Sequence, residues 1–180
     1  MFRLLGLTLA LCASASAFAQ STTAISAKNP ALFARQLEEM GFKTRDLNLE
    51  NAYPTLVLEK DEAPLTLTFG GCEALFHLNC GYVVAVGLFD DVKDPPADWV
   101  AKQNVEFDMI KVWRTDDNIL AFSNGAIIEG WPRQTFIAWI DSINLASDEL
   151  AKEAVDAGLV KDQSAPAPAP HPKASKDRSR

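Results

Sequence analysis

The amino-acid sequence predicts an α+β fold: an antiparallel sheet of about five to six strands with helices packed on it. Three observations support this class. Several stretches repeat apolar residues at helical spacing, several short segments are rich in β-forming residues, and tight turns join consecutive β-rich segments. Strands joined by tight turns pair antiparallel, because parallel neighbours need a long crossover connection. A doubly wound parallel sheet is therefore not expected.

The first predicted helix begins at Asn29-Pro30. Asparagine is a favoured N-cap, and proline fits the first helical position because its missing N–H has no partner there. One apolar face follows at helical spacing: Phe33, Leu37 and Met40. Gly41 is expected to end the helix, with Phe42 contacting Leu37 in a Schellman close.

Three β-rich segments follow this helix. Residues 55–60 are rich in β-formers, and residues 61–64 form a turn. Residues 65–69 alternate strictly, so Leu65, Leu67 and Phe69 are expected to face the core. Residues 82–89 are apolar on both faces, which predicts a central strand covered on both sides.

The second half of the chain also predicts a helix followed by strands, and then a further helix. Asp94-Pro95-Pro96 is expected to cap a helix carrying Trp99, Val100 and Phe107. Residues 109–114 and 119–123 are predicted strands joined by the turn residues Asp116-Asp117-Asn118. Residues 126–128 extend the second of these strands or form a short strand of their own. A helix then begins at Pro132 with one apolar face (Phe136, Ile140 and Ile143), and a shorter amphipathic stretch runs from 148 to 157 before Gly158.

The two ends of the chain are expected to lie outside this domain. Residues 1–19 read as a secretory signal peptide, with Arg3, an apolar run and the small-x-small site Ala17-Phe18-Ala19. A lipoprotein at Cys12 or a retained anchor is the alternative. Residues 20–29 are expected to be a polar lead-in, 30–158 the folded domain, and 159–180 a disordered Ala/Pro-rich basic tail. We therefore expect a periplasmic or secreted protein with no membrane span.

The charge of the chain restricts its partners. The formal net charge is -7, while the tail from Ala165 carries four basic residues against Asp177 alone, so the folded body is more acidic than the whole chain. An acidic body repels phosphate groups, and we expect no nucleic acid as partner.

Two cysteines, Cys72 and Cys80, remain after export, in the loop before the central strand. A nearby pair in an oxidising compartment normally forms a disulfide, and this is the preferred interpretation. Free or regulatory thiols are one alternative. A metal site with His77 is another, although no fourth ligand is evident and no metal is expected.

Catalytic patterns are weak. His77 and His171 are the only histidines, and His171 lies in the tail. No Gly-x-Ser-x-Gly elbow occurs, and no glycine loop suited to phosphate is present. Asp90-Asp91 and the 116–118 turn are better explained as solvated turns than as calcium loops. We expect no catalytic residues and no cofactor.

The tryptophans suggest a binding surface. Aromatic residues at such positions usually belong to the core or its rim. The alternative is a protein-binding face made by Trp113, Arg114 and Trp131, because tryptophan and arginine are frequent binding anchors.

Short motifs in a particular order carry a family resemblance. In chain order they are Leu32, Leu37, Gly41-Phe42, Thr55-Leu56-Val57-Leu58, Phe69-Gly70-Gly71-Cys72, Cys80-Gly81-Tyr82, Asn104, the stretch 111–117, Phe136, Trp139 and Ile140. With this order and spacing, the stretch from Pro30 to Ile143 resembles the YbjN domain, a family described as bacterial sensory transduction regulators. The family often has a second asparagine and an arginine where Ala101 and Val105 stand here, which places any site built on them in doubt.

The resemblance implies a fold similar to that of type III secretion chaperones, which bind proteins and perform no catalysis. It supplies no catalytic residues. The leading interpretation is an exported, non-enzymatic regulatory or protein-binding module of the bacterial envelope, with an unknown envelope protein or a second copy as partner. One alternative is a module that binds a lipid or metabolite between the sheet and a helix. Another is a hydrolase that uses scattered carboxylates.

Overall fold

The computed structural model describes residues 24–60 and 63–160, so the expected signal segment and the proline-rich tail lie outside the described residues. The chain order is β1 (Ile25–Ser26), α1 (Pro30–Glu39), β2 (Lys43–Asn48), β3 (Thr55–Lys60), β4 (Ala63–Gly70), β5 (Tyr82–Lys93), α2 (Ala97–Glu106), β6 (Lys111–Arg114), β7 (Ile119–Ala126), β8 (Glu129–Trp131) and α3 (Arg133–Asp156). The predicted α+β class is confirmed.

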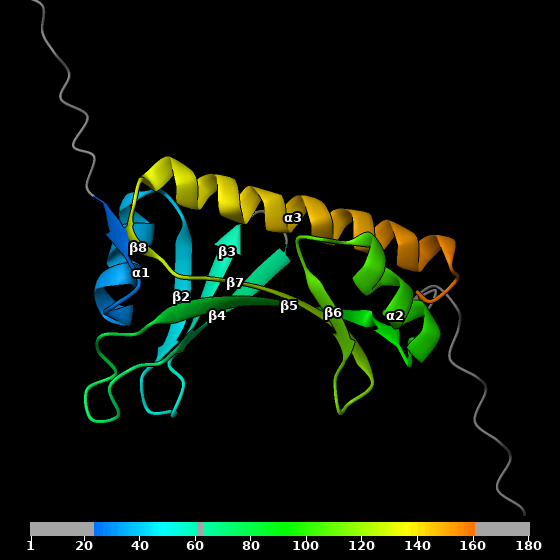
Figure 1. Cartoon of the computed structure of the whole chain (residues 1–180), viewed down its shortest axis with the longest axis horizontal. Helices are drawn as coiled ribbons and strands as arrows, with labels where there is room; N and C mark the ends of the chain where they lie inside the picture. Colours follow the sequence, from blue (N-terminus) through cyan, green and yellow to red (C-terminus); the bar gives the residue numbers. More distant parts are fainter. Residues whose placement is uncertain (1–23, 61–62, 161–180) are drawn as a thin grey trace, which may run out of the picture.

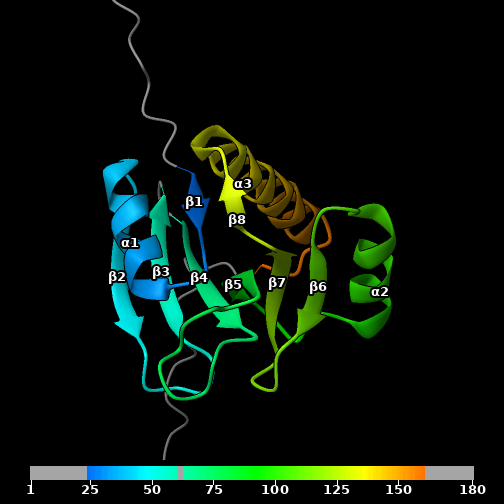
Figure 2. The ribbon, with the colours of Figure 1, turned by 60° about the vertical axis from the view of Figure 1, so that its left-hand side comes forward.

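Two antiparallel sheets organise the described chain. The larger has six strands in the order β2-β3-β4-β5-β7-β6, and the smaller pairs β1 with β8. Figure 1 shows α3 running along one face of the large sheet, with α1 near the β2 end and α2 near the β6 end. Figure 2 shows the same arrangement from the side of α1 and β1. In the described part of the chain, no helix has the length and mean hydropathy that crossing a bilayer requires.

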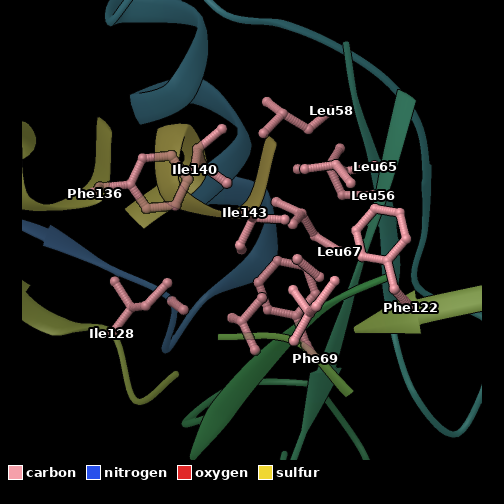
Figure 3. Close-up of a cluster of buried hydrophobic side chains, with 14 of the residues drawn as sticks. Leu56, Leu58, Leu65, Leu67, Phe69, Phe122, Ile128, Phe136, Ile140 and Ile143 are labelled. Atoms are coloured by element: carbon pink, nitrogen blue, oxygen red, sulfur yellow. The ribbon is translucent and has the colours of Figure 1, made fainter. Parts of the chain in front are cut away.

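The hydrophobic core fills the space between the sheet and the helices. Alternate residues of β3 and β4 point into it, as the sequence predicted for Leu65, Leu67 and Phe69. From above, α3 contributes its predicted apolar face: Phe136, Ile140 and Ile143 (Figure 3). Phe33 of α1 packs edge-to-face on Phe69 and on Phe136, with ring centroids 5.7 and 5.6 Å apart. These contacts join α1, the sheet and α3 in one core.

The ends of α1 confirm the predicted caps. The side-chain oxygen of Asn29 accepts a hydrogen bond from the Leu32 amide at 3.1 Å. Gly41 has a φ of 89°, and the Phe42 amide donates to the Leu37 carbonyl at 3.1 Å, which is the Schellman arrangement. Local sequence alone therefore determines where this helix begins and ends.

The central strand differs from its prediction. β5 does lie inside the sheet, between β4 and β7, but its two faces are not equally covered. Val83 and Ala85 are buried under the helices, whereas Val84 and Val86 are only half-buried and Leu88 is exposed. The prediction of cover on both sides is wrong, because α1 and α3 pack on the core face, α2 lies beside the edge strand β6, and Leu88 on the other face stays exposed.

Four further differences concern elements of weak sequence signal. β2 was not predicted, since its side chains are largely polar and exposed at the sheet edge. The expected polar lead-in contributes β1, and its Ile25 and Ala27 are buried. The expected break between two C-terminal helices is absent, because α3 is continuous over 24 residues. Asp90 and Asp91, expected in a turn, belong to β5.

Candidate binding face

The surface of the large sheet opposite α3 is the open face. Strand alternation sends one set of side chains to this surface and the other set to the core. At the centre of the open face, Val84 pairs with Thr68 and Val86 pairs with Thr66 and Ser123. Their half-buried state gives the open face an apolar centre with hydroxyl groups beside it.

Tyrosine and tryptophan side chains border a groove on this face. The groove has a volume of about 390 Å³ and is lined by Tyr53, Thr68, Gly70, Tyr82, Val84, Val86, Trp113 and Ser123. Trp113 stands level with Leu88, since both are in register with Ala121. Tyr82 stands at the other end, where β5 begins. The groove therefore runs along β5 with an aromatic side chain at each end.

The floor at the Tyr82 end depends on a glycine. Gly70 and Tyr82 are cross-strand partners, and a Cβ built on Gly70 would lie 2.1 Å from the Tyr82 ring. The ring thus lies directly over the glycine, a cross-strand aromatic–glycine pair. Any larger residue at position 70 would displace Tyr82 from the groove.

A second hollow adjoins the groove beside α2. It has a volume of about 690 Å³, and Val84 and Ser123 line both depressions. Its outer wall is formed by Asn104 and by the connection from Phe107 to Lys111. The open face is therefore hollowed from the loop of Tyr53 to the start of β6.

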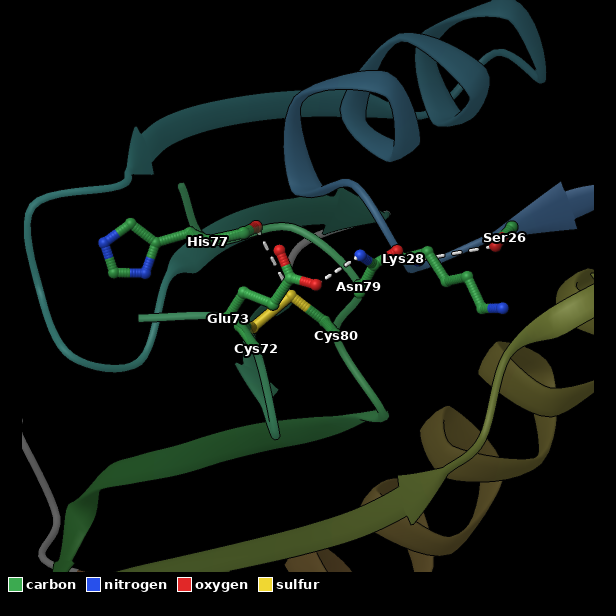
Figure 4. Close-up of a disulfide and its surroundings, with 7 residues drawn as sticks. All are labelled: Ser26, Lys28, Cys72, Glu73, His77, Asn79 and Cys80. Atoms are coloured by element: carbon green, nitrogen blue, oxygen red, sulfur yellow. Dashed lines mark hydrogen bonds between the residues drawn. A yellow bond between two sulfur atoms is a disulfide. The ribbon is translucent and has the colours of Figure 1, made fainter. Parts of the chain in front are cut away.

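The loop between β4 and β5 is closed by the Cys72–Cys80 disulfide, as predicted. Inside it, the Asn79 side chain donates to Glu73 at 2.7 Å (Figure 4). Outside it, the Cys80 amide donates to the Lys28 carbonyl at 3.2 Å. The tip of this tethered loop presents Leu75 and Phe76, which are 86% and 71% exposed. Exposed apolar side chains on a well-tethered loop are typical of an interaction surface.

The three predicted surface residues are not brought together. Trp113 lines the groove, but Arg114, next to it on β6, alternates to the opposite face of the sheet. Trp131 lies on β8 and packs edge-to-face on Trp139 of α3, with ring centroids 6.2 Å apart. Trp139 in turn donates its indole N–H to Asn124 at 2.7 Å on the core side of β7. Of the three, Trp113 alone belongs to the groove.

Sequence reasoning missed the two tyrosines of the groove. Tyr53 lies in the β2–β3 connection and Tyr82 at the first residue of β5, and neither position has a motif of its own. They meet only because β2–β3 and β4–β5 turn at the same end of the sheet (Figure 1). The usable signal is the glycine at position 70, because a glycine within a strand leaves room for an aromatic ring of the neighbouring strand to lie over it.

Asn104 has a structural role at the outer edge of β6. Its amide nitrogen donates to the carbonyls of Val100 and Val112 at 3.0 and 2.7 Å, and its oxygen accepts from the Val112 amide at 2.9 Å. The side chain therefore satisfies both backbone groups of Val112 on the outer edge of β6. Neighbouring Gln103 is fully buried, and its amide atoms have no hydrogen-bond partner among the described residues.

Two carboxylates beside a further hollow are engaged locally. A third depression, between α1 and β2, is lined by both Glu38 and Asp46. Glu38 accepts a hydrogen bond from the Thr44 hydroxyl at 2.7 Å, and Asp46 pairs with Arg45. The hydrogen bond from Arg45 to Glu59, followed by that to Asp46, raises the pKa of the guanidinium above its ordinary value. This arrangement neutralises charge along the exposed β2 edge.

The metal alternative for the cysteine loop is not supported by the described residues. Both cysteine sulfurs are bonded to each other, so neither is a thiolate. Within residues 24–60 and 63–160, no group of three or more His, Cys, Asp or Glu side chains is placed to hold a metal ion.

Comparison with known proteins gives one distant structural likeness. No protein-family model matches the chain, and no curated protein matches it. Among solved structures, the chain is similar to that of YbjN, a proposed transcription regulator from E. coli. The two are 12% identical with a TM-score of 0.44, and the likeness covers 74% of this chain and 96% of that chain. Similarity at this level assigns no function, and the resemblance to the YbjN family stays a prediction.

Proposed function

We propose that this protein is an exported, non-enzymatic module that binds an extended segment of another polypeptide on its open face. One observation carries this proposal: an aromatic-bordered groove on a sheet surface that no described helix covers. Tyrosine and tryptophan are enriched at protein interfaces, where one rigid ring buries a large area. A regulatory role in the envelope follows from the sequence resemblance.

The shape of the groove favours an extended chain as ligand. Its length follows β5 from Tyr82 to the level of Trp113, and its floor consists of Val84 and Val86 with threonine and serine hydroxyls beside them. Alternate side chains of an extended peptide would meet this floor, while the tyrosine hydroxyls at the rim remain available for hydrogen bonds to its backbone.

The compartment is part of the proposal. The N-terminal segment has the pattern of a secretory signal, and a disulfide is stable in an oxidising compartment and rare in the cytosol. The acidic charge of the chain argues against direct contact with DNA.

A small ligand is the second candidate. The hollow beside α2 has a volume of about 690 Å³, within the usual range of ligand sites. Residues of the sheet (Val84 and Ser123) and of α2 (Asn104) line it. A lipid or metabolite that fills this hollow would shift the melting temperature of the protein, whereas a polypeptide-binding face would respond to peptides alone.

The polypeptide hypothesis is tested by a matched pair of charge substitutions. Leu88 on the open face is 55% exposed and Leu145 on α3 is 62% exposed, so glutamate at either site costs little folding stability. A photo-crosslinking amino acid replaces Val86, and its adducts with polypeptides are measured in cells. Leu88→Glu is expected to reduce the yield at least fivefold and Leu145→Glu to leave it unchanged. Equal yields from the two variants would reject the proposal.

A further inference from the structure

The described chain ends beside the strand that forms the groove floor. Gly158 has a φ of 69°, and the Leu159 amide donates to the Ala154 carbonyl at 2.9 Å, so the chain turns sharply after α3. Val160 then forms an antiparallel bridge with Val92 of β5. A chain that continues in this direction runs antiparallel to β5, from Val92 toward Tyr82. Because β4 and β7 already pair with β5 in this part of the sheet, the continuing chain has to lie over a face of the sheet, and the open face is the one that α3 leaves free.

The length of the following sequence matches the distance to be covered. The strand from Val92 to Tyr82 spans about 33 Å at ~3.3 Å per residue. Residues from Lys161 to Pro172 span about 37 Å in a polyproline II conformation, at ~3.1 Å per residue. A segment leaving Val160 along β5 thus reaches Trp113 first and then the Tyr82 end of the groove.

The chemistry of this sequence suits the groove. From Ala165 it reads Ala-Pro-Ala-Pro-Ala-Pro-His-Pro. Proline-rich segments favour polyproline II, lose little entropy on binding, and dock in grooves lined by aromatic side chains. Tyr53, Tyr82 and Trp113 supply such a lining, and the alanines between the prolines are small enough to lie on Val84 and Val86.

The charges of this segment and of the loops at the Tyr82 end favour the same direction of the segment, from Val92 toward Tyr82. The residues after the proline run include Lys173, Lys176 and Arg178. At the Tyr82 end of the groove, the β2–β3 and β4–β5 loops lie side by side in Figures 1 and 2. These loops carry the exposed carboxylates Glu50 and Glu73. A segment laid in this direction brings its basic end to the acidic end of the open face.

We propose that residues Ala165–Pro172 of this chain occupy the groove intramolecularly and compete with the partner polypeptide. This inference rests on the proposed function for its regulatory meaning, since occupancy by the chain's own segment would limit access to the open face. The occupant is therefore a proline-rich segment in polyproline II form, supplied in cis.

The test compares the complete mature chain with a full-length variant in which Pro166, Pro168, Pro170 and Pro172 are alanine. Amide NMR signals of Val84 and Val86 and the indole signal of Trp113 are expected to shift between the two proteins. Signals of Leu145 on α3 serve as the internal control. A synthetic peptide of residues 164–173, added to the alanine variant, is expected to restore the original positions. Unchanged groove signals would overturn the proposal, as would shifts that depend on protein concentration, which indicate the segment of a second copy.

A second variant separates binding from folding. Tyr53 is exposed in a loop, so Tyr53→Ala leaves the core intact. Combined with the alanine variant, it is expected to weaken the affinity for the peptide at least fivefold, and an unchanged affinity would contradict the assigned groove.

The crosslinking yield at Val86 distinguishes the two proposals. If the proline substitutions move no groove signal while Leu88→Glu still removes the crosslinks, the partner-binding function stands and the cis segment is rejected. If groove signals move but no crosslink forms, the partner-binding function alone fails.

Discussion

Asn104 takes the place that a further strand would hold beside β6. Two of its three hydrogen bonds satisfy both backbone groups of Val112 on the free side of this edge strand, and Val112 itself is buried. An edge strand with unpaired backbone groups would attract other chains, and a side chain that covers it prevents such pairing.

Asn104→Ala is expected to lower the free energy of unfolding by about 2–6 kcal/mol. The reason is that two backbone groups of a buried residue lose their partners, at roughly 1–3 kcal/mol each. Urea unfolding measures the loss, and faster hydrogen exchange at the Val112 amide locates it. Val105→Ala on the same helix is the control, because Val105 is 80% exposed. Equal stability of the two variants would contradict the assigned contact.

The disulfide is the other residue-scale determinant of stability. Cys72→Ser opens a loop of about nine residues, and chain entropy predicts a loss of about 2–4 kcal/mol. In a reducing agent, the melting temperature of the wild-type protein should fall to that of the Cys72→Ser variant. The variant should show no response to the reductant. A wild-type melting temperature that is equal with and without reductant would refute the stabilising role.

Paired strands of the large sheet are fitted to each other by two glycine–aromatic contacts, one on each face. Gly70 lies under Tyr82 on the open face, and Gly87 lies under Phe122 on the core face. A Cβ built on Gly87 would lie 2.2 Å from the Phe122 ring. Because the two glycines have no Cβ, the Tyr82 ring lies directly against the backbone of β4 and the Phe122 ring directly against the backbone of β5.

Gly87→Ala is expected to destabilise the protein by about 1–3 kcal/mol, since the buried Phe122 ring must move in a packed core. Gly125→Ala on β7 is a matched control. A Cβ there meets its nearest neighbours at 3.6 Å, which is an ordinary contact. Thermal unfolding of both variants gives the comparison, and a Gly87→Ala protein as stable as the Gly125→Ala protein would disprove the tight fit.

Elements governed by local sequence were predictable, and those governed by distant partners were not. Asn29 and Gly41 act on neighbouring backbone groups, so the ends of α1 follow from a few residues. β2 is polar because it lies at an edge, and it forms because β3 offers it a partner. The short β1 has no pattern of its own, and pairing with β8 across the whole chain creates it.

The N-terminal boundary of the domain is a property of the whole molecule. Ile25 and Ala27 are buried in the common core, and the Ala27 amide donates to the Ile128 carbonyl at 2.9 Å. The folded unit therefore begins before the predicted start at Pro30.

A mature chain that begins at Lys28 is expected to be less stable by about 3 kcal/mol or more than one that begins at Ala24. Loss of one buried isoleucine side chain alone costs about 2–5 kcal/mol when a cavity remains. Urea midpoints of the two proteins measure the difference. Coincident unfolding curves would show that the β1–β8 sheet contributes nothing.

Only part of the candidate site could be predicted, because its residues come from segments that lie far apart in the sequence. Trp113 was identified as a binding anchor because tryptophan is common in such roles, and the structure places it in the groove. Arg114 and Trp131 were grouped with it by residue type, but strand alternation and the fold send them elsewhere. Tyr53 and Tyr82 belong to the groove through the meeting of two loops, which no single segment encodes.

The described chain enters and leaves at opposite ends of the molecule. β1 is held against β8 near the start of α3, whereas Val160 is held against Val92 beyond its end (Figure 1). A tensile load applied through the two ends would therefore act along the long axis of α3. The single-residue bridge of Val160 and the two-residue pairing of β1 would give way first, and the six-stranded sheet would remain intact. Under such a load the domain would extend in two stages, first at its two terminal attachments and then in the six-stranded sheet.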